Sequence, residues 1–264
     1  MNPFPDLQPL PRQLRHPAVR DLAWAILAPP MLAQTPWPQR HPLAGSDWVQ
    51  QPAALEQWLR RLDQDSSALL HWLSLARTRR LGLYYERLWQ FAVRHAPGVE
   101  LLAANLPIRQ AGHTLGELDM LLRDRDGVHH LELAIKLYLG PQDGNGQDTA
   151  QWLGPGCHDR LDRKLAHLAD HQLPISARAQ SREVLATLDI QEFTAHLWLG
   201  GYLLYPARRG RPAFRRPPPA FARALVASAR LAGLYPGQPA GPLAAPAAPC
   251  LAGAGALPGG RNLE

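Results

Sequence analysis

Residues 115–123 and 128–140 alternate between apolar and polar side chains, and this pattern limits the possible folds more than any other part of the sequence. Alternation with a period of two is typical of strands that bury one face. The turn-forming residues Asp124 to Gly127 separate the two segments. We therefore expect an antiparallel hairpin, with strands over these two ranges, as part of a sheet.

The side chains of this hairpin divide into two sets. The apolar set, expected to face the core, comprises Leu118, Met120, Leu122, Leu131, Leu133, Ile135, Leu137 and Leu139. The other set comprises Glu117, Asp119, Leu121, Arg123, His130, Glu132, Ala134, Lys136 and Tyr138. Both strands must bury the same side of the sheet, which requires a connection of two or four residues. Asp119 then lies directly opposite Glu132, with Cβ atoms about 5 Å apart. A three-residue connection with a bulge at Gly127 would instead separate them onto opposite faces.

Two opposed carboxylates repel each other unless a cation joins them. Lys136 shares their face, and a divalent ion would also neutralise the charge. Oxygen ligands of this kind suit Mg²⁺ or Mn²⁺. Such a site can polarise a phosphodiester and activate water, while a lysine stabilises the developing charge. The alternative is an ion-pair cluster on a solvated sheet face.

The rest of the chain before Pro206 alternates between helical and extended patterns. Helices are expected over residues 16–27, 52–62, 65–73, 83–95, 158–171 and 177–188, and two further strands over residues 101–110 and 193–205. From residue 80 onward the order is helix, three strands, helices and a strand, which predicts an α/β fold.

Composition suggests three regions. Residues 1–79 form an N-terminal helical extension, residues 80–205 the α/β core, and residues 206–264 a segment rich in Ala, Pro, Gly and Arg that we expect to be disordered. Eight of the 28 basic residues and one of the 22 acidic residues lie in this last segment. The net charge of +6 therefore belongs to the tail and says little about what the core binds.

Localisation is predicted from what the sequence lacks. No stretch reaches the roughly 18 apolar residues that span a membrane, and no secretion signal precedes the first helix. Cys157 and Cys250 are too few for a disulfide framework or a four-ligand zinc site. We expect a cytoplasmic protein with no membrane partner.

The motif Gly116–Asp119, followed by Glu132 and then a lysine, resembles the core of PD-(D/E)XK, or restriction-endonuclease-like, nucleases. The resemblance covers residues 80–205 and implies an αβββαβ core. It also implies a Mg²⁺-dependent nuclease that acts on nucleic acid. Asp119 and Glu132 would bind the metal, Glu86 on the preceding helix would complete its site, and Lys136 would stabilise the phosphate in the transition state.

The lysine departs from this motif. Ala134 occupies the usual lysine position, and Lys136 lies two residues, or about 6.7 Å, further along the strand on the same face. Either its long side chain reaches back, or catalysis has been lost. In the second case the chain would be a non-catalytic scaffold that acts as a nucleic-acid-binding or protein-interaction module.

The helix after the third strand carries a basic stripe. The equivalent helix of these nucleases often faces the phosphate backbone, so the resemblance implies phosphate contacts for Arg160 and Lys164. The alternative is a solvated face balanced by nearby acids. Only two lysines, Lys136 and Lys164, stand among the 28 basic residues, which favours a chemical role for each.

Three short segments also resemble an uncharacterised bacterial family, domain-of-unknown-function family 1853 (DUF1853). These segments are Arg15–Pro17, Leu83–Glu86 and Glu132–Lys136. The family is grouped with the same nucleases, but its name implies no activity.

Overall fold

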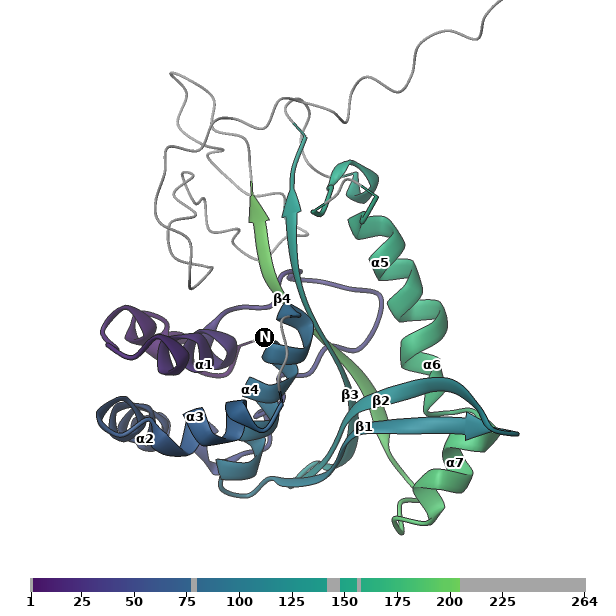
Figure 1. Cartoon of the computed structure of the whole chain (residues 1–264), viewed down its shortest axis with the longest axis horizontal. Helices are drawn as coiled ribbons and strands as arrows, with labels where there is room; N and C mark the ends of the chain where they lie inside the picture. Colours follow the sequence, from purple (N-terminus) through teal and green to yellow (C-terminus); the bar gives the residue numbers. More distant parts are fainter. Residues whose placement is uncertain (1, 77–79, 142–147, 156–157, 205–264) are drawn as a thin grey trace, which may run out of the picture. The chain divides into compact units, whose positions relative to one another are not determined.

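The computed structural model describes residues 2–76, 80–141, 148–155 and 158–204. The predictions made for residues 206–264 lie outside these ranges. Within them, the chain forms a four-stranded sheet with helices on both faces (Figure 1).

The strands follow one another across the sheet in chain order (Figure 1). They are β1 (Glu100–Gln110), β2 (His113–Asp124), β3 (Gly127–Leu139) and β4 (Thr194–Leu204). The first three are antiparallel, whereas β4 runs parallel to β3. A parallel neighbour requires a crossover connection, and helices supply it here. The predicted mixed α/β architecture and the order of its elements are confirmed.

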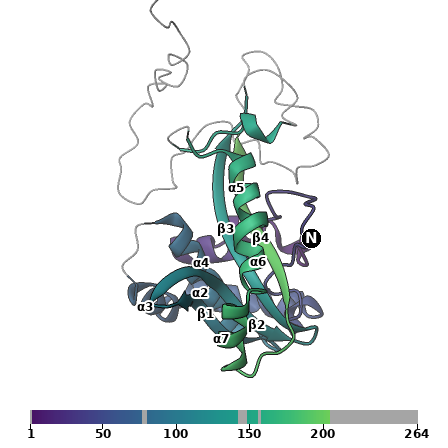
Figure 2. The same cartoon turned by 90° about the vertical axis from the view of Figure 1, so that its right-hand side faces the viewer.

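The helices form two groups, one on each side of the sheet (Figures 1 and 2). The first group is α1 (Pro17–Leu27), α2 (Pro52–Gln64), α3 (Ser67–Ser74) and α4 (Leu81–His95). The second group, between β3 and β4, is α5 (Leu161–His167), the π turn η5 (Leu168–Gln172), α6 (Leu173–Ile175) and α7 (Ala179–Ala186). Four short 3₁₀ turns are η1 (Pro5–Leu7), η2 (Leu10–Arg12), η3 (Asp47–Val49) and η4 (Thr149–Gln151).

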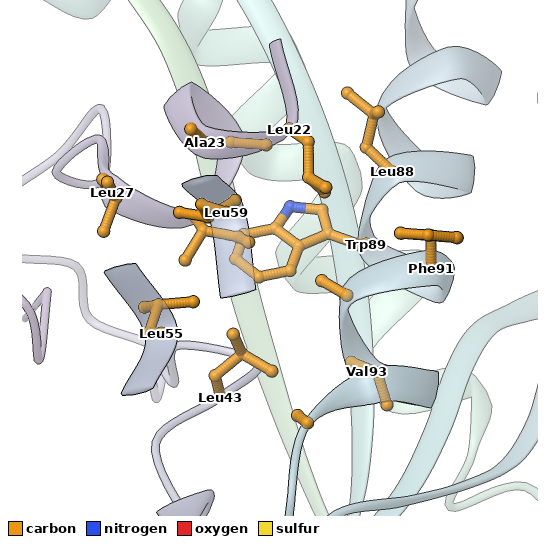
Figure 3. Packing of buried hydrophobic residues seen from close by; sticks show 14 of the residues in the cluster. Leu22, Ala23, Leu27, Leu43, Leu55, Leu59, Leu88, Trp89, Phe91 and Val93 are labelled. Carbon is orange, nitrogen blue, oxygen red and sulfur yellow. The ribbon is translucent and has the colours of Figure 1, made fainter. Parts of the chain in front are cut away.

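The largest core cluster joins the N-terminal helices to the sheet. Trp89 of α4 is fully buried and lies among Leu22 of α1, Leu59 of α2 and Leu88 (Figure 3). The same cluster includes the apolar residues Met120, Leu122, Leu131 and Leu133 of the hairpin, as their alternation predicted. The N-terminal helices α1, α2 and α3 therefore share one core with α4 and the sheet.

The opposite face of the sheet is also buried, contrary to the alternative of a solvated face. Leu121, Ala134 and Tyr138 pack there in two further clusters with residues from the second group of helices. The reason is topological: the crossover to a parallel β4 places its helices over this face. Leu139, expected in the core, is instead 55% exposed.

The predicted register of the hairpin is confirmed. Met120 pairs with Leu131 and Asp124 with Gly127, so the connection contains two residues. The pairing of β2 with β3 ends at Met120 and does not include Asp119, the residue that precedes Met120 in the chain. Leu118, which was expected to share the core with Met120, instead packs with Ile108 and Leu121. The strict alternation of β2 therefore breaks at Asp119.

The break coincides with an irregularity in β1. Asn105 has a φ of +52°, in the left-handed region that asparagine tolerates better than most residues. Its neighbours Ala104 and Leu106 pair with Met120 and Leu118, so Asn105 stands opposite Asp119. This local distortion frees Asp119 from the regular ladder.

None of the helices in the described ranges is long and apolar enough to cross a membrane.

Candidate active site

Asp119 lies where the paired part of β2 and β3 ends. Its carboxylate accepts a hydrogen bond at 2.9 Å from the backbone N–H of Leu133. Burial, the negative charge of Glu132 and, more weakly, that of Glu86 raise the pKa of Asp119 to about 8. The Leu133 hydrogen bond and Lys164 oppose this shift without cancelling it. Asp119 therefore holds a proton at neutral pH as long as no cation balances its neighbours.

Glu132 is fully buried, and both of its oxygens are held. His130 Nε2 lies 2.8 Å from Oε1, and the amide of Gln172 donates to Oε2 at 2.7 Å. His130 is oriented in turn by Ser176, whose hydroxyl lies 3.0 Å from Nδ1. Because its partners come from β3 and from the crossover helix, the carboxylate has one well-defined orientation.

Glu86 of α4 and Glu117 of β2 add two more carboxylates next to this pair. The side-chain amide of Asn105 joins them, donating to Glu86 at 3.0 Å and to Glu117 at 2.9 Å. Its oxygen accepts a hydrogen bond from Gln90 at 2.7 Å. Burial raises the pKa of Glu86, the Asn105 hydrogen bond lowers it, and the charges of Glu117 and Glu132 raise it further. We call these four carboxylates, Glu86, Glu117, Asp119 and Glu132, the acidic cluster.

Lys136 does not reach back to the position left by Ala134. Its ammonium pairs with Asp159 at 2.5 Å, and the same carboxylate accepts a hydrogen bond from Tyr138 at 3.2 Å. The alternation of the strand places Lys136 on the same face as Glu132, as expected, but its ammonium forms an ion pair with Asp159 instead. Of the two alternatives for Lys136, the one in which its long side chain reaches back to that position is therefore wrong.

The two basic residues predicted to contact phosphate on the crossover helix differ in their surroundings. Arg160 forms a bidentate ion pair with Asp162, and one of its two hydrogen bonds is 2.9 Å long. This pair matches the alternative of a solvated face on which nearby acids balance the basic residues. Lys164 instead points toward the acidic cluster, where its ammonium donates to Gln172 at 2.8 Å. Only Lys164 is thus brought together with the predicted metal ligands.

Sequence reasoning missed Asn105 and Gln172. Asparagine is unfavourable inside a strand, so its position in the middle of the predicted strand 101–110 was an available signal. Gln172 gave no such signal, because it faces Glu132 only through a π turn that periodicity does not reveal.

The ligand chemistry of the acidic cluster suits a hard divalent ion. No three Asp, Glu, His or Cys side chains among the described residues form a ready-made ligand group. Mg²⁺, however, commonly takes one or two protein carboxylates and completes its shell with water and substrate phosphates. Asp119 and Glu132, two carboxylates on neighbouring strands, meet that requirement.

Comparison with known families agrees with the resemblance noted in the sequence, and two of its three segments, Leu83–Glu86 and Glu132–Lys136, lie within the matched residues. The family model described as domain of unknown function (DUF1853) matches residues 20–238. The comparisons with curated proteins and with solved structures found no significant match. Because the matched region covers most of the chain, this protein belongs to the DUF1853 family.

Proposed function

We propose that the chain is a divalent-metal-dependent nuclease that hydrolyses phosphodiester bonds in nucleic acid. One observation carries this proposal: the Leu133 N–H holds Asp119 beside the fully buried Glu132, where burial and the charge of Glu132 raise the pKa of Asp119. A protein gains no stability from such repulsion. A site that takes up a cation explains why both acids are present.

Asp119 and Glu132 would hold Mg²⁺ or Mn²⁺, with Glu86 contributing negative charge from α4. When bound, such an ion polarises a phosphoryl oxygen and lowers the pKa of water. The protein's part is to position the ligands. His130 and Gln172 fix the orientation of Glu132, and the Leu133 N–H fixes that of Asp119.

The order of elements supports the same proposal. A helix carrying Glu86, three antiparallel strands carrying Asp119 and Glu132, a crossover helix and a parallel strand correspond to the αβββαβ core of the PD-(D/E)XK nucleases. We place the chain in that superfamily as part of the proposal. The DUF1853 family description itself names no activity.

A non-catalytic scaffold is the second candidate. The observation in its favour is that Glu132 already accepts hydrogen bonds at both oxygens, while Lys136 is paired with Asp159. A chain that had lost catalysis could keep these contacts for stability. It would then act as a nucleic-acid-binding or protein-interaction module.

A cleavage assay separates the two candidates. Purified protein is incubated with single-stranded, double-stranded and branched DNA and with RNA, in Mg²⁺, Mn²⁺ or EDTA. We expect cleavage in Mn²⁺ or Mg²⁺, none in EDTA, and none with Asp119→Asn. Asp170→Asn, a matched change at an exposed acid of η5, serves as the control and should cleave normally. Failure to cleave any of these substrates would favour the non-catalytic scaffold.

A further inference from the structure

We propose that Lys164 of α5 is the cation of the acidic cluster and faces the substrate phosphate there, while Lys136 is a structural ion-pair partner of Asp159. The role assigned to Lys164 toward phosphate rests on the proposed nuclease function. Its role as the counter-charge of the cluster does not.

The first support is a chain of hydrogen bonds. The ammonium of Lys164 donates to Gln172 Oε1 at 2.8 Å, and the same amide donates through Nε2 to Glu132 at 2.7 Å. One glutamine therefore links the lysine to the central carboxylate. An ammonium has three N–H donors, and the bond to Gln172 uses one of them.

The second support is the shape of the crossover helix. Gln172 follows Lys164 by eight positions, whereas two turns of a regular α-helix take only about 7.2 residues. In such a helix the two side chains would therefore point in different directions. The π turn Leu168–Gln172 takes up one additional residue. Eight residues then make about two full turns, and both side chains face the cluster. Such π turns are often found at functional sites.

The third support is how the charges are distributed. Lys164 is partly buried, and burial and the charge of Lys136 lower its pKa, while Asp119, Glu132 and Asp159 raise it. Asp159 is in direct contact with Lys136. The two lysines thus divide the acids between them: Lys136 balances Asp159, and Lys164 is left with Glu132, to which Gln172 links it.

This position suits the stabilisation of a phosphate. A phosphodiester drawn to the carboxylates by a metal ion would carry developing negative charge on its oxygens. An ammonium held by one bond to a neutral amide can turn its remaining donors toward that charge. Lys136, locked at 2.5 Å to a carboxylate, would first have to break an ion pair.

Four double-mutant cycles at pH 7 test the electrostatic assignment without any activity measurement. Lys164→Met and Lys136→Met are each combined with Glu132→Gln and with Asp159→Asn, and the free energy of unfolding is measured. We expect the destabilisation by Lys164→Met to shrink in the Glu132→Gln background, and that by Lys136→Met to shrink only in the Asp159→Asn background. Coupling of Lys136, rather than Lys164, to Glu132 would overturn the proposal.

Cleavage and Mn²⁺ affinity test the catalytic part. Lys164→Met should lower the cleavage rate by about 100-fold or more, and it should bind Mn²⁺ at least as tightly as the wild type because a repelling charge is gone. A purely structural defect would weaken Mn²⁺ binding. Lys164→Arg should recover part of the rate, and Lys136→Met should cleave almost as well as the wild type.

Loss of cleavage in Lys136→Met, with Lys164→Met active, would overturn the catalytic role of Lys164. A wild-type protein that cleaves no substrate would instead refute the nuclease proposal. The double-mutant cycles would then still decide whether Lys164 is the counter-charge of the cluster.

Discussion

The carboxylate of Asp119 on β2 accepts the backbone N–H of Leu133 on β3 at 2.9 Å, one residue beyond Glu132. The backbone pairing of β2 and β3 ends at Met120 and Leu131. Just beyond that point, the Asp119 side chain supplies the hydrogen bond between the two strands. The bond holds Asp119 beside Glu132 despite their mutual repulsion. Asp119 would be free to turn away without it, so this contact defines the site.

Asp119→Asn should stabilise the metal-free protein. The amide oxygen can still accept the Leu133 N–H, while the repulsion with Glu132 disappears. At pH 8 the gain should be roughly 2 kcal/mol or more, because a pKa unit corresponds to about 1.4 kcal/mol. Chemical denaturation in EDTA measures it, and the exposed change Asp170→Asn should have almost no effect.

The same substitution should change how stability depends on pH. The pKa of Asp119 is raised in the folded protein to about 8, from 3.8. Between these values the folded state holds a proton that the unfolded state has released, so the contribution of Asp119 to stability falls as pH rises from about 4 to 8. The advantage of Asp119→Asn over the wild type should therefore grow across this range and level off above pH 8. An advantage that is constant with pH would show that Asp119 is ionised at neutral pH.

His130→Ala should destabilise the protein more than Ser176→Ala. The first change deprives a fully buried carboxylate of its partner at 2.8 Å, at a cost of about 1–3 kcal/mol or more. The second removes the partner of His130 Nδ1 and a long hydrogen bond of 3.5 Å to the Leu173 carbonyl, at about 1 kcal/mol. If both variants unfold at the same denaturant concentration, His130 is not what holds Glu132 in place.

Two changes at Asn105 separate its backbone strain from its hydrogen bonds. Asn105→Gly and Asn105→Ala both remove the amide that joins Glu86 and Glu117, but only alanine is strained at a φ of +52°. We expect both variants to be destabilised, with alanine lower by about 1 kcal/mol. Thermal unfolding of the pair measures this difference. Alanine as stable as glycine would mean that residue 105 leaves the left-handed conformation.

The sequence predicted the features that depend on local pattern. The helices, the four strands and the two-residue connection all follow from periodicity and turn residues, and the register follows from the need to bury Met120 and Leu131 on one side. Contacts between distant segments could not be predicted this way. Asp159, 23 residues after Lys136 in the chain, captures its ammonium, and no pattern in the strand reveals that acid.

The same limit explains the error at Leu118 and the new role of Lys164. Alternation assumes a regular ladder, whereas the left-handed Asn105 breaks it opposite Asp119. Helical periodicity assumes a regular α-helix, whereas the π turn rotates Gln172 into line with Lys164. Both irregularities lie at the acidic cluster, where the fold departs from ideal geometry to bring these groups together.

Calorimetric titration with Mn²⁺ between pH 6 and pH 9 tests most directly whether the acidic cluster is a metal site. We predict binding that strengthens about tenfold per pH unit and levels off above pH 8, as the ion displaces the proton of Asp119. Asp119→Asn should abolish it, and Asp170→Asn should leave it unchanged. Absence of binding at every pH, or equal binding by Asp119→Asn, would contradict the assignment of this cluster as a metal site.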